Sequence, residues 1–158
     1  MIQIYLSNLH CFEETSEFSA SDEPYVLVTA VDLAARQQVA GFPVPLPTFD
    51  VVRYGPFDDV DDGETHFASG IGQSFWGMNG RATALTDPDQ AIFVVALMEH
   101  DAGRPGTLQG IVKGIVGGSV LGSLGLDRGS KVDGLLRDVS SALGTPSGPS
   151  VDQDDAVG

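Results

Sequence analysis

The sequence predicts a mainly β fold with one α-helical hairpin near the C-terminal end of the chain. Two apolar runs carry this prediction: residues 25–31 are rich in β-branched side chains, and residues 91–98 are continuously apolar over the length of one strand. Residues 131–143 instead place their apolar side chains at the helical period. The 158 residues suit a single domain, because domains most often hold about 100–150 residues.

The first half of the chain is extended. Residues 2–6 (IQIYL) alternate and predict a strand, residues 25–31 predict a second strand, and residues 48–54 (TFDVVRY) predict a further one. Residues 41–49 (GFPVPLPTF) contain three alternating prolines. Because proline cannot donate a hydrogen bond to a strand ladder, this segment is expected to be an extended edge or a linker rather than a central strand.

The second half changes from strand to helix. Residues 58–64 (DDVDDGE) predict an acidic turn, and an EF-hand loop is a poor alternative because Val60 stands where a ligand belongs. Residues 91–98 have the length and continuity of a buried strand. Residues 107–126 show neither strand alternation nor proline, and residues 131–143 follow the helical period, so the two segments predict a helical hairpin.

The chain is strongly acidic. It carries 22 Asp and Glu residues against 8 Lys and Arg residues, a net charge of −14. This balance argues against nucleic-acid binding, which depends on clustered basic side chains. It also argues against direct attraction to an anionic membrane, unless a divalent cation reverses the local charge.

Many of the acidic side chains lie where predicted strands end. The three groups are Glu13, Glu14, Glu17, Asp22 and Glu23; Glu99 and Asp101; and Asp152, Asp154 and Asp155. Carboxylates gathered in one place repel one another, which is unfavourable without a cation. Calcium prefers such ligands and takes about 6–8 oxygens, whereas a single cysteine and three histidines make zinc and copper poor candidates.

Three motifs in these regions resemble, in chain order, motifs of C2 domains. Residues 19–28 (SASDEPYVLV) resemble the family's SDPYVKV signature, with Glu23 inserted before the proline. Residues 96–101 (ALMEHD) resemble the strand that opens the third calcium loop, with Glu99 in place of the first Asp, and residues 152–158 (DQDDAVG) resemble the motif that closes that loop. With its helical segment, the chain is similar to a bacterial group of C2-like domains.

The resemblance implies an antiparallel β-sandwich in which residues 1–158 form one domain. Because the opening and closing motifs stand close together in the family, residues 104–150 are expected to be a helical insertion within the third loop. C2 domains continue with further strands after the closing motif, so the chain is expected to be a fragment or to have an incomplete sheet. The implied calcium ligands are Asp22, Glu99, Asp101 and Asp154, with Glu14 and Asp155 as further candidates.

The function that follows is calcium-dependent binding to a membrane surface or a protein partner. Bound calcium would cancel the charge of the loops and bridge to phosphate or carboxylate groups, including those of anionic lipid. The simpler alternative for each acidic group is that it is only solvated, and for Glu13, Glu14 and Glu17 this alternative is favoured because the loop has more acids than one site needs.

A second hypothesis concerns four glycines spaced every four residues, Gly110, Gly114, Gly118 and Gly122. On a helix they form a smooth stripe that allows close approach. Residues 108–126 hold one charge, Lys113, and are long enough to span a bilayer. Packing of the stripe against the second helix or the sheet is the favoured interpretation. The alternative function is therefore a structural module that oligomerises, or inserts into a membrane, through this hairpin.

Catalysis is not expected. The chain lacks the GxSxG, P-loop and GxGxxG patterns, and His100, between Glu99 and Asp101, is the main candidate for acid–base chemistry. Trp76 is expected to be a core residue. The first residues, MIQIYLSNLH, show neither a basic segment nor a small-residue cleavage site, so no secretory signal is expected. We expect a cytoplasmic protein or one exported by a non-classical route.

Overall fold

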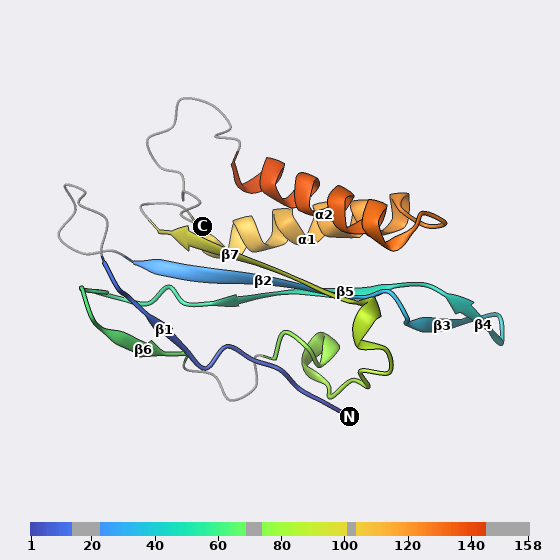
Figure 1. Ribbon diagram of the computed structural model, residues 1–158, viewed down its shortest axis with the longest axis horizontal. Helices are drawn as coiled ribbons and strands as arrows, with labels where there is room; N and C mark the ends of the chain where they lie inside the picture. The colour runs from blue at the N-terminus through green and yellow to red at the C-terminus, as the bar shows by residue number, and fades with distance from the viewer. Residues whose placement is uncertain (14–22, 69–73, 101–103, 145–158) are drawn as a thin grey trace.

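A three-stranded antiparallel sheet forms the centre of the protein (Figure 1). The computed structural model describes residues 1–13, 23–68, 74–100 and 104–144. The central strands, in the spatial order β5-β2-β7, are β2 (Pro24–Asp32), β5 (Thr48–Tyr54) and β7 (Ala91–Glu99). The middle strand, β2, is buried along nearly its whole length because both of its faces are covered.

Shorter elements surround this sheet. One two-stranded sheet pairs β1 (Asn8–His10) with β6 (Thr65–Phe67), and another pairs β3 (Arg36–Val39) with β4 (Phe42–Pro45). Two short 3-10 helices precede β7, namely η1 (Met78–Gly80) and η2 (Pro88–Gln90). Two α-helices follow β7, namely α1 (Pro105–Gly122) and α2 (Arg128–Leu143).

The two helices form a hairpin that covers one face of the central sheet (Figure 1). Val112, Val116 and Val120 of α1 are at most 5 % exposed and pack with Leu135 and Val139 of α2 against the sheet. These valines recur every four residues, so they lie on one side of the helix. Burying each of these side chains contributes about 1.5–3 kcal/mol, which makes the hairpin part of the core.

Local sequence signals determine where the helices begin. Pro105 stands at the first position of α1. A backbone N–H at this position would have no acceptor within the helix, so proline, which lacks one, is well tolerated there. Gly125, with a φ of +87°, lies in the turn between the helices. Asp127 caps α2: its Oδ1 accepts the backbone N–H of Ser130 at 3.0 Å, and its Oδ2 accepts the Ser130 hydroxyl at 2.7 Å. These hydrogen bonds hold the pKa of Asp127 below its usual value.

The opposite face of the sheet is covered by the N-terminal segment and by residues 54–60 and 74–78. Trp76 is fully buried and packs with Ala30 of β2, which confirms its expected place in the core. The Ile4 N–H donates to the Trp76 carbonyl at 2.9 Å and ties the N-terminus to this layer.

Most of the expected elements are confirmed, and two differ. The strands expected at 25–31, 48–54 and 91–98 correspond to β2, β5 and β7, and the proline-rich segment forms the exposed strand β4. Residues 2–6 do not form a strand: Ile2 and Ile4 make only isolated bridges, and the regular strand begins later, at β1. β7 is not buried throughout, because it lies at the edge of the sheet and leaves Phe93 41 % and Val95 61 % exposed.

The four glycines of α1 do not pack as expected. Gly110, Gly114, Gly118 and Gly122 are exposed, and a Cβ added to any of them would meet no atom within 4 Å. The valines occupy the packed side of the helix, because a valine buries apolar surface and a glycine has almost none to bury. Helix packing against α2 and the sheet is therefore present, but the glycine stripe takes no part in it.

The antiparallel sheets and the helical hairpin confirm a mainly β fold with two helices. The helices lie within the region expected to be an insertion, of which residues 145–150 are outside the described part of the chain. In that described part, no helix combines the length and the apolarity needed to cross a bilayer.

Candidate functional site

The end of the sheet where β2 begins and β7 ends is the place predicted to bind calcium. The two strands are antiparallel and register Pro24 opposite Glu99, so the residues flanking two of the three acidic groups lie side by side. The His100 N–H donates to the Glu23 carbonyl at 3.2 Å, which extends the pairing beyond the strands. The His100 Nδ1 and the Glu23 Oε2 are 3.0 Å apart and form a second link between the same two residues.

Glu99 is the one predicted calcium ligand that the described residues include. It is 8 % exposed, at the last position of β7. The other predicted ligands lie outside the described residues, and they are Glu14, Asp22, Asp101, Asp154 and Asp155. In sequence, Asp22 directly precedes Glu23 and Asp101 directly follows His100.

The described residues, 1–13, 23–68, 74–100 and 104–144, contain no group of three or more His, Cys, Asp and Glu side chains that could hold a metal ion.

The acidic turn at residues 58–64 makes contacts within itself and with the next strand. Glu64 accepts a hydrogen bond from the Asp61 N–H at 3.3 Å, and its Oε2 lies 3.0 Å from the His66 Nε2. These contacts hold the pKa of Glu64 below its usual value, with the His66 bond as the larger cause. The turn is thus formed as expected.

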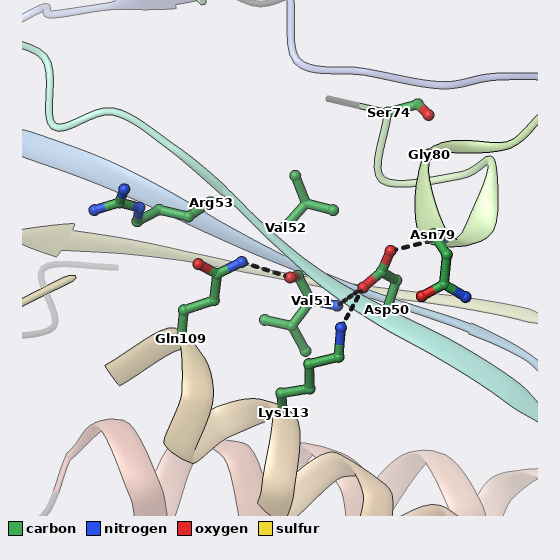
Figure 2. Close-up of a pocket in the computed structure, with 9 residues that line it drawn as sticks. All are labelled: Asp50, Val51, Val52, Arg53, Ser74, Asn79, Gly80, Gln109 and Lys113. Carbon is green, nitrogen blue, oxygen red and sulfur yellow. Dashed lines mark hydrogen bonds and ion pairs between the residues drawn. The ribbon is translucent and has the colours of Figure 1, made fainter. Parts of the chain in front are cut away.

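A second candidate site, which the sequence did not indicate, is a polar cleft along the free edge of β5 (Figure 2). Its volume is about 450 Å³, within the usual range for small-molecule sites of about 300–1,000 Å³. β5 contributes Asp50 and Arg53, η1 contributes Asn79, and α1 contributes Gln109 and Lys113. Figure 2 shows Gln109 and Lys113 extending from α1 toward β5.

Asp50 holds the walls of the cleft together. Its Oδ1 accepts the Val51 N–H and the Lys113 ammonium, both at 3.0 Å, and its Oδ2 accepts the Asn79 N–H at 3.0 Å (Figure 2). The Asp50 side chain is 10 % exposed, and Lys113 is 48 % exposed. One nearly buried carboxylate therefore connects β5, η1 and α1 with charge-assisted hydrogen bonds, which are about twice as strong as neutral ones.

The exposed side of α1 is a third surface of interest. It carries the four-glycine stripe together with Ile111, 50 % exposed, and Leu121, 59 % exposed. Lys113 lies at its border and pairs with Asp50. This side of the helix is consequently smooth and uncharged, in a chain whose net charge is −14.

No protein family, curated protein or solved structure matches this chain in the comparisons made.

Proposed function

We propose that this chain is a C2-like module that binds calcium at the end of the sheet where β2 begins and β7 ends. The observation that carries the proposal is the register of Pro24 opposite Glu99, reinforced by the two contacts between Glu23 and His100. Calcium loops of a C2-like sandwich require these two strand ends to be neighbours. Glu99, Asp22, Asp101 and Asp154 are the proposed ligands, with Glu14 and Asp155 completing the shell.

The proposed mechanism is electrostatic. Calcium bound by several carboxylates would order the loops and reverse the local negative charge. Its remaining coordination positions would then bridge to phosphate or carboxylate groups on a membrane surface or a protein partner. Calcium bound only to the folded state would stabilise it by RT ln(1 + [L]/Kd), about 2.7 kcal/mol at 100 times Kd.

Thermal unfolding of metal-stripped protein tests the proposal. Calcium at 100 times Kd should raise the Tm by roughly 5–10 °C, since 1 kcal/mol shifts a chain of this size by about 2–4 °C. Glu99→Gln should abolish most of the shift, while the matched control Asp133→Asn, at an exposed position of α2, should retain it. Asp101→Asn serves as a second variant if Glu99→Gln does not fold. No shift at millimolar calcium in the wild type would refute the proposal.

Vesicle sedimentation identifies the target. Calcium-dependent sedimentation with phosphatidylserine vesicles, and none with phosphatidylcholine vesicles, would assign an anionic membrane surface. A calcium-dependent Tm shift without sedimentation on either vesicle would instead assign a protein partner bearing carboxylate or phosphate groups.

The alternative function is assembly through the exposed side of α1. It is favoured by the uncharged glycine stripe and the neighbouring Ile111 and Leu121, which would allow a second helix to approach closely. Gly114→Lys adds a charge where nothing lies within 4 Å of the new Cβ, so the monomer should tolerate it. Light scattering should then show a smaller particle than for the wild type, while Ser140→Lys on the exposed side of α2 leaves the size unchanged. A monomeric wild type at all concentrations removes this alternative.

A further inference from the structure

No other strand of the sheet pairs with the outer edge of β5, but a further strand could not pair with the middle of this edge, at Val51. The Val51 N–H donates to the Asp50 Oδ1 at 3.0 Å, and the Val51 carbonyl accepts the Gln109 Nε2 at 2.8 Å. An added strand would need these same backbone groups for its ladder. The cleft therefore suits a small molecule rather than an extended peptide.

The charges that line the cleft favour an anion. Arg53 and Lys113 supply two positive charges and Asp50 one negative charge, which leaves one positive charge. The Asp50 carboxylate already accepts three hydrogen bonds, so it has little capacity left for a cationic ligand. Lys113 uses one of its three N–H donors on Asp50, and the other two remain for a ligand.

Arg53 is the strongest single indication that the cleft binds an anion. It is half-buried on β5, and within the described segments its guanidinium makes neither a hydrogen bond nor an ion pair. Carboxylates greatly outnumber cations in this chain, yet none of those described pairs with Arg53. A guanidinium presents a planar fork that matches a carboxylate or phosphate group with two parallel hydrogen bonds.

Two of the remaining polar residues of the cleft are anchored by hydrogen bonds, Asn79 through its backbone and Gln109 through its side chain. Asn79 has a left-handed backbone (φ 55°, ψ 38°), a conformation that asparagine tolerates better than most residues. Its backbone N–H donates a hydrogen bond to the Asp50 carboxylate. Gln109 commits its amide nitrogen to Val51, which leaves its carbonyl oxygen to accept a hydrogen bond. The Asn79 backbone and the Gln109 side chain are therefore in place before any ligand arrives, which reduces the entropy lost on binding.

We propose that this cleft binds a small molecule through a carboxylate or phosphate group held by Arg53. Because the Arg53 side chain extends away from Lys113 (Figure 2), Lys113 would contact a second polar or anionic group of the same molecule. Gln109 and Asn79 would contact hydroxyl or amide groups on the rest of the molecule. This site is separate from the proposed calcium site, which lies at the end of the sheet rather than along its edge.

A titration followed by ¹⁵N NMR tests the proposal, with inorganic phosphate and citrate as separate probes at constant ionic strength. The protein is stripped of metal and the chelator is then removed, because EDTA is itself a polycarboxylate. Either probe should shift the amides of Val51, Arg53, Gln109 and Lys113 in a saturable manner. The probe that saturates at the lower concentration distinguishes a phosphate from a carboxylate ligand.

Two variants and one control assign the contact. Arg53→Gln should weaken binding at least tenfold, and Arg53→Lys, which keeps the charge but loses the fork, should weaken it less. Arg137→Gln removes the same charge at an exposed position of α2 and should bind as the wild type does. The spectra themselves report whether each variant is folded. The proposal is overturned if neither probe saturates the cleft amides, or if Arg53→Gln binds as tightly as Arg137→Gln.

Discussion

Replacing exposed glycines of α1 by alanine should stabilise the protein. Glycine inside a helix is less favourable than alanine by about 0.5–1 kcal/mol, because its unfolded backbone has more freedom to lose. Gly110, Gly114 and Gly118 lie within α1, and a Cβ at each would meet nothing within 4 Å. The triple alanine variant should therefore gain roughly 1.5–3 kcal/mol in the free energy of unfolding.

Urea denaturation followed by circular dichroism measures this gain, with two single variants as controls. Gly117→Ala should gain less, since its Cβ would lie 3.2 Å from the Phe49 Cζ. Gly125→Ala should lose stability, because the φ of +87° at this position disfavours any side chain. A triple variant no more stable than the wild type would refute the exposed placement of the stripe.

Substitutions at Val116, Asp127 and Lys113 probe the packing and polar contacts of the helical hairpin. Val116→Ala should lower the free energy of unfolding by roughly 1.5–3 kcal/mol in the same urea assay, because it leaves a cavity between α1 and the sheet. Asp127→Ala should lower the Tm and Asp127→Ser should largely preserve it, since serine also caps helices. The depressed pKa of Asp127 means that its contribution is present above its ordinary pKa of 3.8 and is lost as the pH falls through the lower, folded value, which a pH series of Tm values checks. Lys113→Met should lower the free energy of unfolding by about 1–2 kcal/mol, because it removes one partner of the nearly buried Asp50; adding Asp50→Asn should restore part of that loss.

The sequence predicted the strands and helices well because each has a strong local signal. The β-branched run became β2, and the helical period of residues 131–143 became α2. Residues 2–6 alternate as a strand does, but Ile2 and Ile4 bridge to separate partners, Thr83 and Trp76, and no continuous ladder forms. Alternation alone does not reveal whether a neighbouring strand exists.

The prediction that the glycine side of α1 packs against the second helix or the sheet is wrong for an identifiable reason. Glycines and valines both recur every four residues along this helix, so the four-residue period alone does not show which side is buried. The valine pattern was the better guide, since only valine gains from burial. The edge position of β7, and hence the exposure of Val95, depends on sheet order, which the strand's own sequence does not encode.

The polar cleft could not be predicted from the sequence, because the residues that line it are far apart in the chain. Asp50 is joined to Asn79 and Lys113 by contacts that span 29 and 63 residues. One signal was available: Lys113 is the single charge in the apolar segment 108–126, and an isolated charge there indicates a specific partner. Which carboxylate it meets follows only from the packing of α1 beside β5.

Calcium titration of ¹⁵N-labelled, metal-stripped protein tests the central proposal most directly, because it reports position as well as binding. We expect saturable shifts at the amides of Glu23, Glu99 and His100, where the ends of β2 and β7 adjoin. The amides of the acidic turn at residues 58–64 should stay in place. Shifts confined to that turn, or no saturable shift at millimolar calcium, would contradict a calcium site at this end of the sheet.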